Sequence, residues 1–244
     1  MSRARLHVPE AAPGARVLLS DHTAHHAREV LRLKAGAEVS VFDGAGHEFE
    51  AVLDEVSRRR VSAALGSRIE PRPESPLHLV LAVAPLRGDR MELVLQKATE
   101  LGVSEVWPVV THRTDAVARP ALRGTRDRRW ERVVSGAAEQ CGRATVPLVA
   151  STTTLAEMLQ KPFAGTRSVL LETADEPPLP TLEAPSALLL VVGPAGGFEP
   201  AEIDTLRSAC FHTVSLGPRI LRSETAAVAA VALAQALWGD LGIG

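Results

Sequence analysis

Apolar and polar positions in the second half of the chain follow two alternating periods. Short apolar runs of strand length recur, and we expect strands over residues 77–85, 103–111, 168–171, 188–192 and 213–216. Amphipathic stretches lie between them, and we expect helices from a cap at Asp89 to a stop at Gly102, over 126–143, after a Thr154/Glu157 capping box, and over 224–238. This alternation predicts an α/β fold with a mostly parallel sheet covered on both faces.

Residues 1–70 follow a different, β-rich pattern. Glycine-containing turns separate short apolar runs, which predict strands over 16–19, 38–42, 50–53 and 60–63, with one short helix over 22–32. Short strands at even spacing are typical of a small barrel. The interleaved prolines Pro71, Pro73 and Pro76 indicate a linker. We therefore predict two domains, residues 1–72 and residues 73–244.

The last predicted helix, over 224–238, is apolar nearly all round. A helix without a polar face is buried, either in a core or in a subunit interface. Because this helix is the last element of the chain, it favours a homodimer.

Composition limits the class of protein further. The 244 residues are 45% hydrophobic, but no run reaches the length of a membrane span and no signal-like segment opens the chain. Cys141 and Cys210 suit neither a disulfide framework nor a zinc site, so we expect reduced thiols, a cytoplasmic protein and no metal. The formal net charge is −2, yet the 27 basic residues include only three lysines. A locally arginine-rich face is compatible with selective RNA binding, and also with an ordinary solvated surface.

A glycine-rich turn follows the strongest apolar run, in the segment ALLLVVGPAGGF of residues 187–198. Glycines allow the backbone to approach a ligand closely, and Pro194 stiffens the turn. The turn matches neither the dinucleotide-binding pattern nor a Walker A sequence, which argues against nicotinamide and nucleoside-triphosphate sites. Taken alone, it is equally compatible with an ordinary strand-to-helix turn.

A second turn, VSLGPRILRSETAA over residues 214–227, places two arginines, an acid and a hydroxyl within a few positions. In the simplest interpretation, Ser223 caps the final helix and Glu224 complements its dipole. That interpretation leaves the apolar Ile220 and Leu221 unexplained, whereas a wall for a flat group such as adenine explains them. Because the two turns are close in sequence, we expect their strands to be neighbours that share one ligand.

The two turns resemble those of the RsmE family of ribosomal RNA methyltransferases, which belongs to the SPOUT superfamily. The matching residues are Gly193-Pro194, Gly196-Gly197-Phe198, Leu216-Gly217, Arg219-Ile220-Leu221-Arg222 and Glu224-Thr225-Ala226. Further blocks match in order along the chain, and they include Gln96–Val103, Ala138–Cys141, Val30–Lys34 and Val41–Gly44.

The resemblance implies a PUA-like N-terminal β-barrel and a C-terminal SPOUT α/β domain with a deep trefoil knot. It also implies a homodimer that binds S-adenosyl-L-methionine (SAM) and methylates N3 of a uridine in 16S rRNA of the small ribosomal subunit. The residues expected to bind the cofactor are Leu171, Glu172, Gly193, Pro194, Gly196, Gly197, Leu216, Gly217, Ile220, Leu221, Arg222 and Thr225.

The same resemblance suggests residues for catalysis and RNA binding. Uracil N3 must lose a proton, so a base is expected, and an arginine would stabilise the negative charge that develops. Arg222 is the first candidate and Arg143 the second, while Glu139 is the candidate carboxylate, although its spacing to Arg143 also fits a helix-surface ion pair. The base itself stays open. The arginines expected to contact RNA are Arg5, Arg32, Arg87, Arg113, Arg123 and Arg126.

Two positions depart from the family pattern. Ala195 stands where the family usually has glutamate, and His7 stands where an aromatic residue usually follows arginine. Two alternatives therefore stay open: a SPOUT methyltransferase with another RNA target, such as a ribose 2′-hydroxyl, and a non-catalytic RNA-binding or ribosome-assembly protein of the same fold.

Overall fold

The computed structural model describes residues 3–114, 127–172 and 175–242. The chain forms two compact units. Unit 1 contains residues 1–74 together with 135–146, and unit 2 contains residues 75–134 and 147–244. The predicted N-terminal domain corresponds to most of unit 1, but the return of residues 135–146 to that unit is not visible in the sequence pattern.

Unit 1 is built on a five-stranded sheet with the order β1-β3-β4-β5-β2. Its strands are β1 (Ala4–His7), β2 (Arg16–Leu18), β3 (Glu38–Phe42), β4 (Glu48–Val56) and β5 (Val61–Ile69). β1 pairs in parallel with β3, and the other pairs are antiparallel. The predicted helix consists of α1 (Asp21–His25), which continues into the π-helix η1 (His26–Val30). Four of the five strands were predicted; β1 was not, and closure into a barrel stays a prediction.

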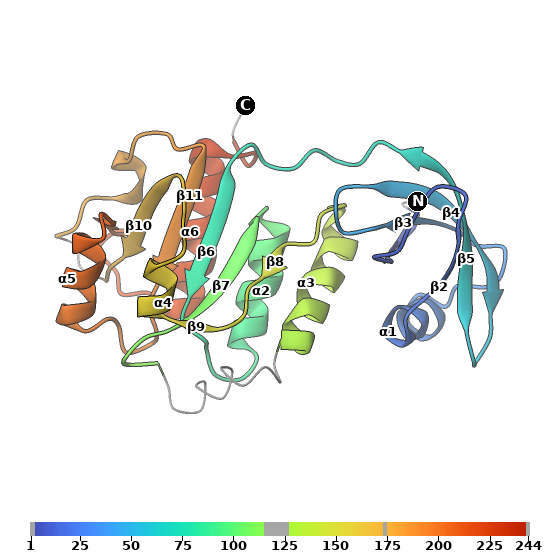
Figure 1. Cartoon of the computed structure of the whole chain (residues 1–244), viewed down its shortest axis with the longest axis horizontal. Helices are drawn as coiled ribbons and strands as arrows, with labels where there is room; N and C mark the ends of the chain where they lie inside the picture. Colours follow the sequence, from blue (N-terminus) through green and yellow to red (C-terminus); the bar gives the residue numbers. More distant parts are fainter. Residues whose placement is uncertain (1–2, 115–126, 173–174, 243–244) are drawn as a thin grey trace. The chain divides into compact units, whose positions relative to one another are not determined.

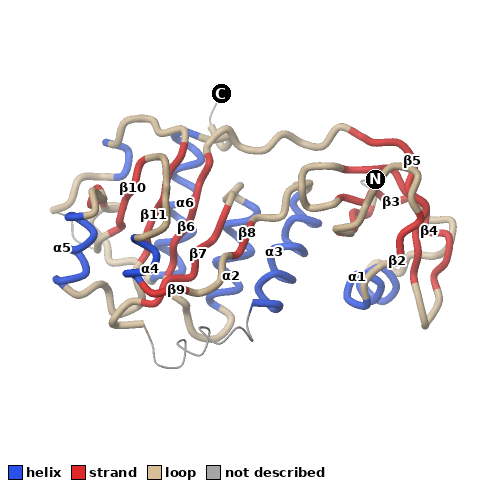
Figure 2. The backbone as a smooth tube through the Cα atoms, in the orientation of Figure 1, coloured by secondary structure: helices blue, strands red, loops and turns tan. Residues whose placement is uncertain are grey.

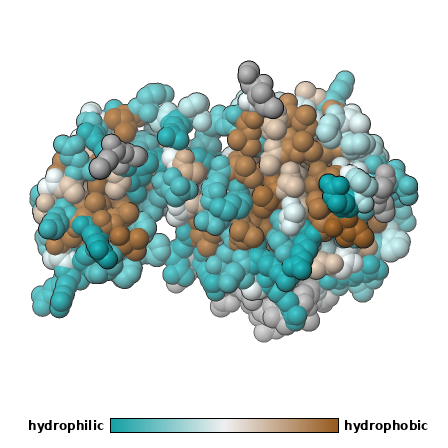
Figure 3. Space-filling view, turned by 180° about the vertical axis from the view of Figure 1, so that it is seen from behind, coloured by the Kyte–Doolittle hydropathy of each residue, from teal (hydrophilic) through white to brown (hydrophobic). Residues whose placement is uncertain are grey.

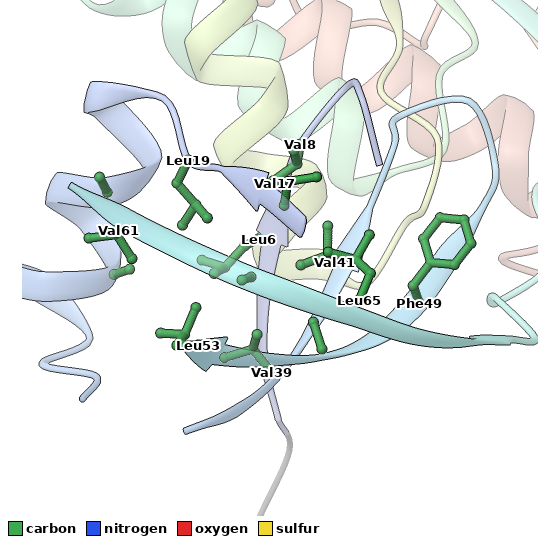
Figure 4. Packing of buried hydrophobic residues seen from close by; sticks show 14 residues of the cluster. Leu6, Val8, Val17, Leu19, Val39, Val41, Phe49, Leu53, Val61 and Leu65 are labelled. Atoms are coloured by element: carbon green, nitrogen blue, oxygen red, sulfur yellow. The ribbon is translucent and has the colours of Figure 1, made fainter. Parts of the chain in front are cut away.

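Alternate side chains of this sheet fill one core. Leu6, Val39, Val41, Leu53 and Val61 are buried, and Figure 4 shows them pointing toward one another from β1, β3, β4 and β5. The β3–β4 turn is fixed by Asp43, whose Oδ1 accepts hydrogen bonds from the amides of Ala45 at 2.7 Å and His47 at 3.0 Å.

Arg5 of β1 joins this sheet to the end of α3 (Asp127–Cys141). Its guanidinium donates to both carboxylate oxygens of Glu48 at 2.9 and 2.8 Å, and to the carbonyls of Ala138, Glu139 and Arg143. These five bonds match the five donors of a guanidinium. Burial alone would raise the pKa of Glu48, but hydrogen bonds from Arg5 and Ser40 hold this pKa below its usual value.

Unit 2 contains a sheet in which every strand pair is parallel, with the order β12-β10-β11-β6-β7-β8 and with β9 also paired to β7. The strands are β6 (His78–Val83), β7 (Glu105–Val110), β8 (Leu148–Val149), β9 (Thr153–Thr154), β10 (Thr166–Leu170), β11 (Ala187–Val192) and β12 (His212–Val214). The predicted parallel sheet is confirmed. The expectation that the strands before the two turns are neighbours is wrong, because β10 lies between β11 and β12.

Helices cover both faces of this sheet (Figures 1 and 2). The helices are α2 (Arg90–Glu100), α4 (Leu155–Leu159), α5 (Pro200–Ser208) and α6 (Ser223–Trp238), with a short 3-10 turn η3 (Leu179–Thr181). Val80, Ala82, Leu189 and Val191 pack with side chains of α4 and α5. The alternate strand residues face the other side, where α2 and α6 pack against each other. The Thr154/Glu157 capping box is present as predicted.

We predict that Arg5→Met lowers the free energy of unfolding by about 3 kcal/mol, because the buried Glu48 carboxylate loses its charged partner. Urea unfolding followed by circular dichroism measures this change. The matched control is Arg3→Met. Arg3 pairs with Glu38 and Glu50 at half-exposed sites, where water screens the charges, so its loss should destabilise the protein much less than the loss of Arg5. Equal effects of the two substitutions would contradict the assignment.

Candidate functional site

A pocket of about 230 Å³ lies at the carboxyl ends of β10 and β11 and beside the loop after β12. Parallel strands present their carboxyl ends at one edge of a sheet, where loop backbones and helix N-termini form ligand sites. The lining includes nine of the predicted cofactor-binding residues: Leu171, Glu172, Gly193, Pro194, Gly196, Gly197, Leu216, Gly217 and Leu221. The intervening strand β10 supplies Leu171 and Glu172 to the pocket.

Backbone, rather than side chains, forms the wall at the glycine-rich turn. A Cβ on Gly193 would lie 2.8 Å from Phe198 Cε2, so only glycine fits beneath this buried ring. Gly197 has a φ of +68°, and its amide donates to the Pro194 carbonyl at 2.9 Å. The turn is therefore closed by its own backbone and leaves a cradle that a ligand can approach closely.

The second turn contributes Leu216, Gly217, Arg219 and Leu221 to the lining. Gly217 has a φ of +100°, which favours glycine at this bend. Ile220, by contrast, is 77% exposed and does not line the pocket of a single chain.

The start of α6 differs from the simplest expectation. The helix begins at Ser223 with Arg222 as its N-cap residue, and no side chain caps it, so the predicted Ser223 cap is wrong. Ser223 is instead buried and lines the pocket. Arg222 and Thr225 are exposed and lie outside the lining. Within the described ranges, the Arg222 guanidinium forms no hydrogen bond or ion pair, which leaves it available to a ligand.

Seven lining residues are absent from the predicted site residues: Leu170, Val192, Phe198, Ile203, Arg219, Ser223 and Ala226. Most are apolar residues of the sheet and helices, where pattern alone signals only a core. Arg113, predicted as an RNA contact, also lines the pocket.

Comparison with known proteins identifies the family. Two family profiles match: an RNA methyltransferase domain over residues 73–235 and an RNA methyltransferase PUA domain over residues 19–65. A ribosomal RNA small subunit methyltransferase E from Synechocystis is 34% identical over 236 residues, which cover 94% of this chain and 76% of that protein. The chain belongs to the ribosomal RNA small subunit methyltransferase E family.

Solved structures support this membership over the whole chain. The family member from Neisseria gonorrhoeae, whose crystal structure contains S-adenosyl methionine, is 36% identical with a TM-score of 0.89 and covers 98% of this chain and 100% of that one. A methyltransferase from Legionella pneumophila, also with bound SAM, is 33% identical with a TM-score of 0.91 and the same coverage.

Two residues expected to take part in the family's chemistry are held by contacts within unit 1. Arg143 pairs with Glu74 through three hydrogen bonds of 2.6 to 3.3 Å. Glu139 accepts a hydrogen bond at 2.8 Å from the amide of His7. Burial raises the pKa of the Glu139 carboxyl, which favours its protonated form.

The six predicted RNA-binding arginines are placed differently. Arg5 uses its donors within unit 1, and Arg113 borders the pocket, whereas Arg32 and Arg87 are exposed. Arg123 and Arg126 lie outside the described residues. Arg32 adopts a φ of +53° after η1, an unusual conformation for a residue with a side chain.

The described ranges contain no cluster of three or more histidine, cysteine or acidic side chains that could hold a metal ion. None of the helices in those ranges combines the length and apolar character of a membrane-spanning segment.

His7, the departure from the family at the N-terminus, is packed into unit 1. Its ring lies 5.1 Å from the Phe42 ring, and its Nδ1 lies 2.6 Å from Ser135 Oγ. A Cβ on Gly44 would come within 2.6 Å of His7 Nε2, so glycine is needed there. Burial lowers the pKa of His7 below its usual 6.5 despite the opposing effect of Asp43.

We predict that the stability of unit 1 decreases as the pH falls below 6.5, because the unfolded chain binds a proton on His7 that the folded chain resists. One such group changes the unfolding free energy by at most about 1.4 kcal/mol per pH unit. Hydrogen exchange of the β1 and β3 amides between pH 7.5 and 5.5, a window set by that pKa, measures it. His7→Phe should remove the dependence, and the control His25→Gln, at an exposed position, should retain it. An unchanged pH dependence in His7→Phe would assign the effect to other groups.

Proposed function

We propose that this chain transfers a methyl group from SAM to N3 of a uridine in 16S rRNA of the small ribosomal subunit. The observation that carries the proposal is the backbone-walled pocket at Gly193–Gly197, in a chain that aligns over 98% of its length with two SAM-bound methyltransferases. With ribosomal RNA as substrate and SAM as cofactor, we propose that the reaction takes place in the cytoplasm.

The lining fits the chemical parts of SAM. The cofactor supplies an electrophilic methyl group on a sulfonium. Leu171, Leu216 and Leu221 offer an apolar wall for the adenine, and the exposed Glu172 carboxylate offers acceptors for ribose hydroxyls. Backbone groups of the two turns supply the remaining polar contacts. We keep Ile220, Arg222 and Thr225 in the proposed cofactor-binding set because each is next in the chain to a residue of the lining.

We assign the main catalytic role to Arg222. When uracil N3 loses its proton, the negative charge spreads onto the flanking O2 and O4 oxygens, and a guanidinium can donate a charge-assisted hydrogen bond to one of them. Arg222 is exposed next to Ser223, which lines the pocket. Glu139 and Arg143 were the other catalytic candidates, and because their side chains are held by His7 and Glu74, we assign them structural roles in unit 1.

The family's closed PUA-like barrel and deep trefoil knot are part of this proposal. Support comes from the two profile matches and from the TM-score of 0.89 with the Neisseria enzyme. We also propose that Arg32, Arg87, Arg123 and Arg126 contact RNA phosphates, which would make RNA affinity depend strongly on salt.

We further propose that the protein forms a homodimer through α2 and α6. The outward face of α6 carries Val228, Ala229 and Ala232, and next to it Leu93 of α2 is 44% exposed. Figure 3 shows the molecule from the side of these helices, with apolar surface on unit 2. Packing this face against a second copy would remove it from water.

A second candidate function rests on Ala195. If the family's glutamate takes part in binding or catalysis, the chain could instead be a non-catalytic RNA-binding or ribosome-assembly protein of the same fold. The tests below separate the two functions.

The first test is methyl transfer from SAM to small subunits that lack the modification, followed by mass spectrometry of the digested rRNA. We expect N3-methyluridine to form only when the protein is present. Arg222→Ala should lower the rate by a factor of about 100 to 1,000, because it removes a charge-stabilising donor, and Arg222→Lys should retain part of it. A product methylated at another atom would contradict the proposed specificity. SAM binding without any transfer would point to another RNA target, and failure to bind SAM as well would favour the non-catalytic function.

The second test concerns the homodimer. We expect light scattering to give twice the chain mass for the wild type and a single chain mass for Leu93→Asp, because a carboxylate cannot be buried unpaired in an apolar interface. The matched control is Leu148→Asp, at a residue that is 60% exposed on β8 and outside this face, and it should stay dimeric. A wild type that is monomeric at micromolar concentration would rule out the proposed dimer.

A further inference from the structure

The loop after β7 is closed by its own hydrogen bonds and borders the pocket through Arg113. Thr111 and Thr114 are both buried, the Thr111 amide donates to Thr114 Oγ1 at 2.9 Å, and the two hydroxyls lie 3.0 Å apart. The Thr114 amide in turn donates to the Thr111 carbonyl at 3.1 Å. This closed four-residue loop fixes the two residues between its ends, His112 and Arg113.

Arg113 reaches from this loop to the glycine-rich turn. Its Nη1 donates to the Gly196 carbonyl at 3.0 Å, and a Cβ on Gly196 would lie 3.4 Å from Arg113 Cβ. The segment from Gly193 to Gly197 has no polar side chain of its own, since Ala195 stands where the family usually has glutamate. Among the described residues, Arg113 supplies the one side-chain hydrogen bond that holds this segment.

Two glutamates at the start of α5, just after the glycine-rich turn, also contact the loop after β7. His112 Nδ1 lies 2.9 Å from Glu199 Oε1, and the His112 amide donates to Glu202 Oε1 at 2.8 Å. Glu202 also accepts from the Glu199 amide at 2.9 Å as part of the capping box of α5. Glu199 lies 3.8 Å from Arg113 Nε. The loop after β7 is thereby attached both to Gly196 in the pocket wall and to the start of α5, which follows that wall in the chain.

We propose that Arg113 is a positioning residue for the cofactor: it holds the Gly196 carbonyl, and so the backbone cradle, in the conformation that binds SAM. This inference rests on the proposed function. It gives Arg113 a role that differs from the phosphate contact expected from its place in an arginine-rich stretch. Its interaction is made before RNA arrives, so we expect an effect on SAM affinity in the absence of RNA.

The test compares SAM binding by the wild type, Arg113→Ala and Arg113→Lys using isothermal titration calorimetry of the full chain without RNA. Loss of a hydrogen bond from a charged donor should raise the Kd of Arg113→Ala about tenfold. Arg113→Lys should fall between the two, because an ammonium can donate to Gly196 but lacks the planar fork. The KM for SAM should rise in parallel while kcat at saturating SAM stays close to that of the wild type.

The matched control is Arg207→Ala. Arg207 belongs to the same unit, is 50% exposed compared with 46% for Arg113, and forms an ion pair with Glu176 outside the pocket. It should bind SAM as the wild type does. Thermal unfolding without SAM checks that the variants are folded, and if Arg113→Ala is not, the comparison of Arg113→Lys with the wild type decides the test.

Unchanged SAM affinity in a folded Arg113→Ala would overturn the inference alone. Arg113 would be an RNA ligand if that variant instead bound RNA more weakly, and if the salt dependence of its RNA binding fell by the amount expected for about one phosphate contact. A wild-type chain that fails to bind SAM would overturn the proposed function together with this inference.

Discussion

The parallel pairing of β10 with β11 on one side and β12 on the other determines where the pocket lies. Because all three strands run in the same direction, their carboxyl ends lie at one edge, and the segments that follow them meet there. Leu171 follows β10, Gly193 follows β11 and Leu216 follows β12, so three separate stretches of chain line one pocket. The two turns line one pocket although their strands are not neighbours, because β10 lies between those strands and the residues that follow it join the lining.

Most of unit 2 could be predicted from its sequence because local patterns of apolar, polar and glycine residues mark its strands, helices and turns. Apolar runs such as residues 188–192 lie on a sheet that is buried on both faces, and glycine at positions 193 and 217 marks turns whose geometry needs it. Strand order has no such local signal. It depends on which long connections cross the sheet. The short separation in sequence predicts β12 as a neighbour of β11, whereas β10 and β6 flank that strand.

In unit 1, the failures of sequence reasoning have a different cause. β1 is four residues long and pairs in parallel with β3, so it has neither a hairpin turn nor a long apolar run to reveal it. Arg5 and Glu139 are charged residues, and charge in a sequence suggests solvent or chemistry. Their partners, Glu48 and the His7 amide, are 43 and 132 residues away, respectively, and only the folded chain shows that both groups are satisfied internally.

The same distinction bears on Ala195. In the sequence, the alanine that replaces the family's usual glutamate in the glycine-rich turn leaves a non-catalytic protein open as an alternative. In the structure, the pocket wall at this turn is made of backbone, and its hydrogen bond to Arg113 comes from a different loop. A wall held in this way does not need a side chain at position 195 to keep its shape. Any contribution of the family's glutamate that this chain lacks would therefore concern its charge near the substrate, and the cofactor cradle itself would be preserved.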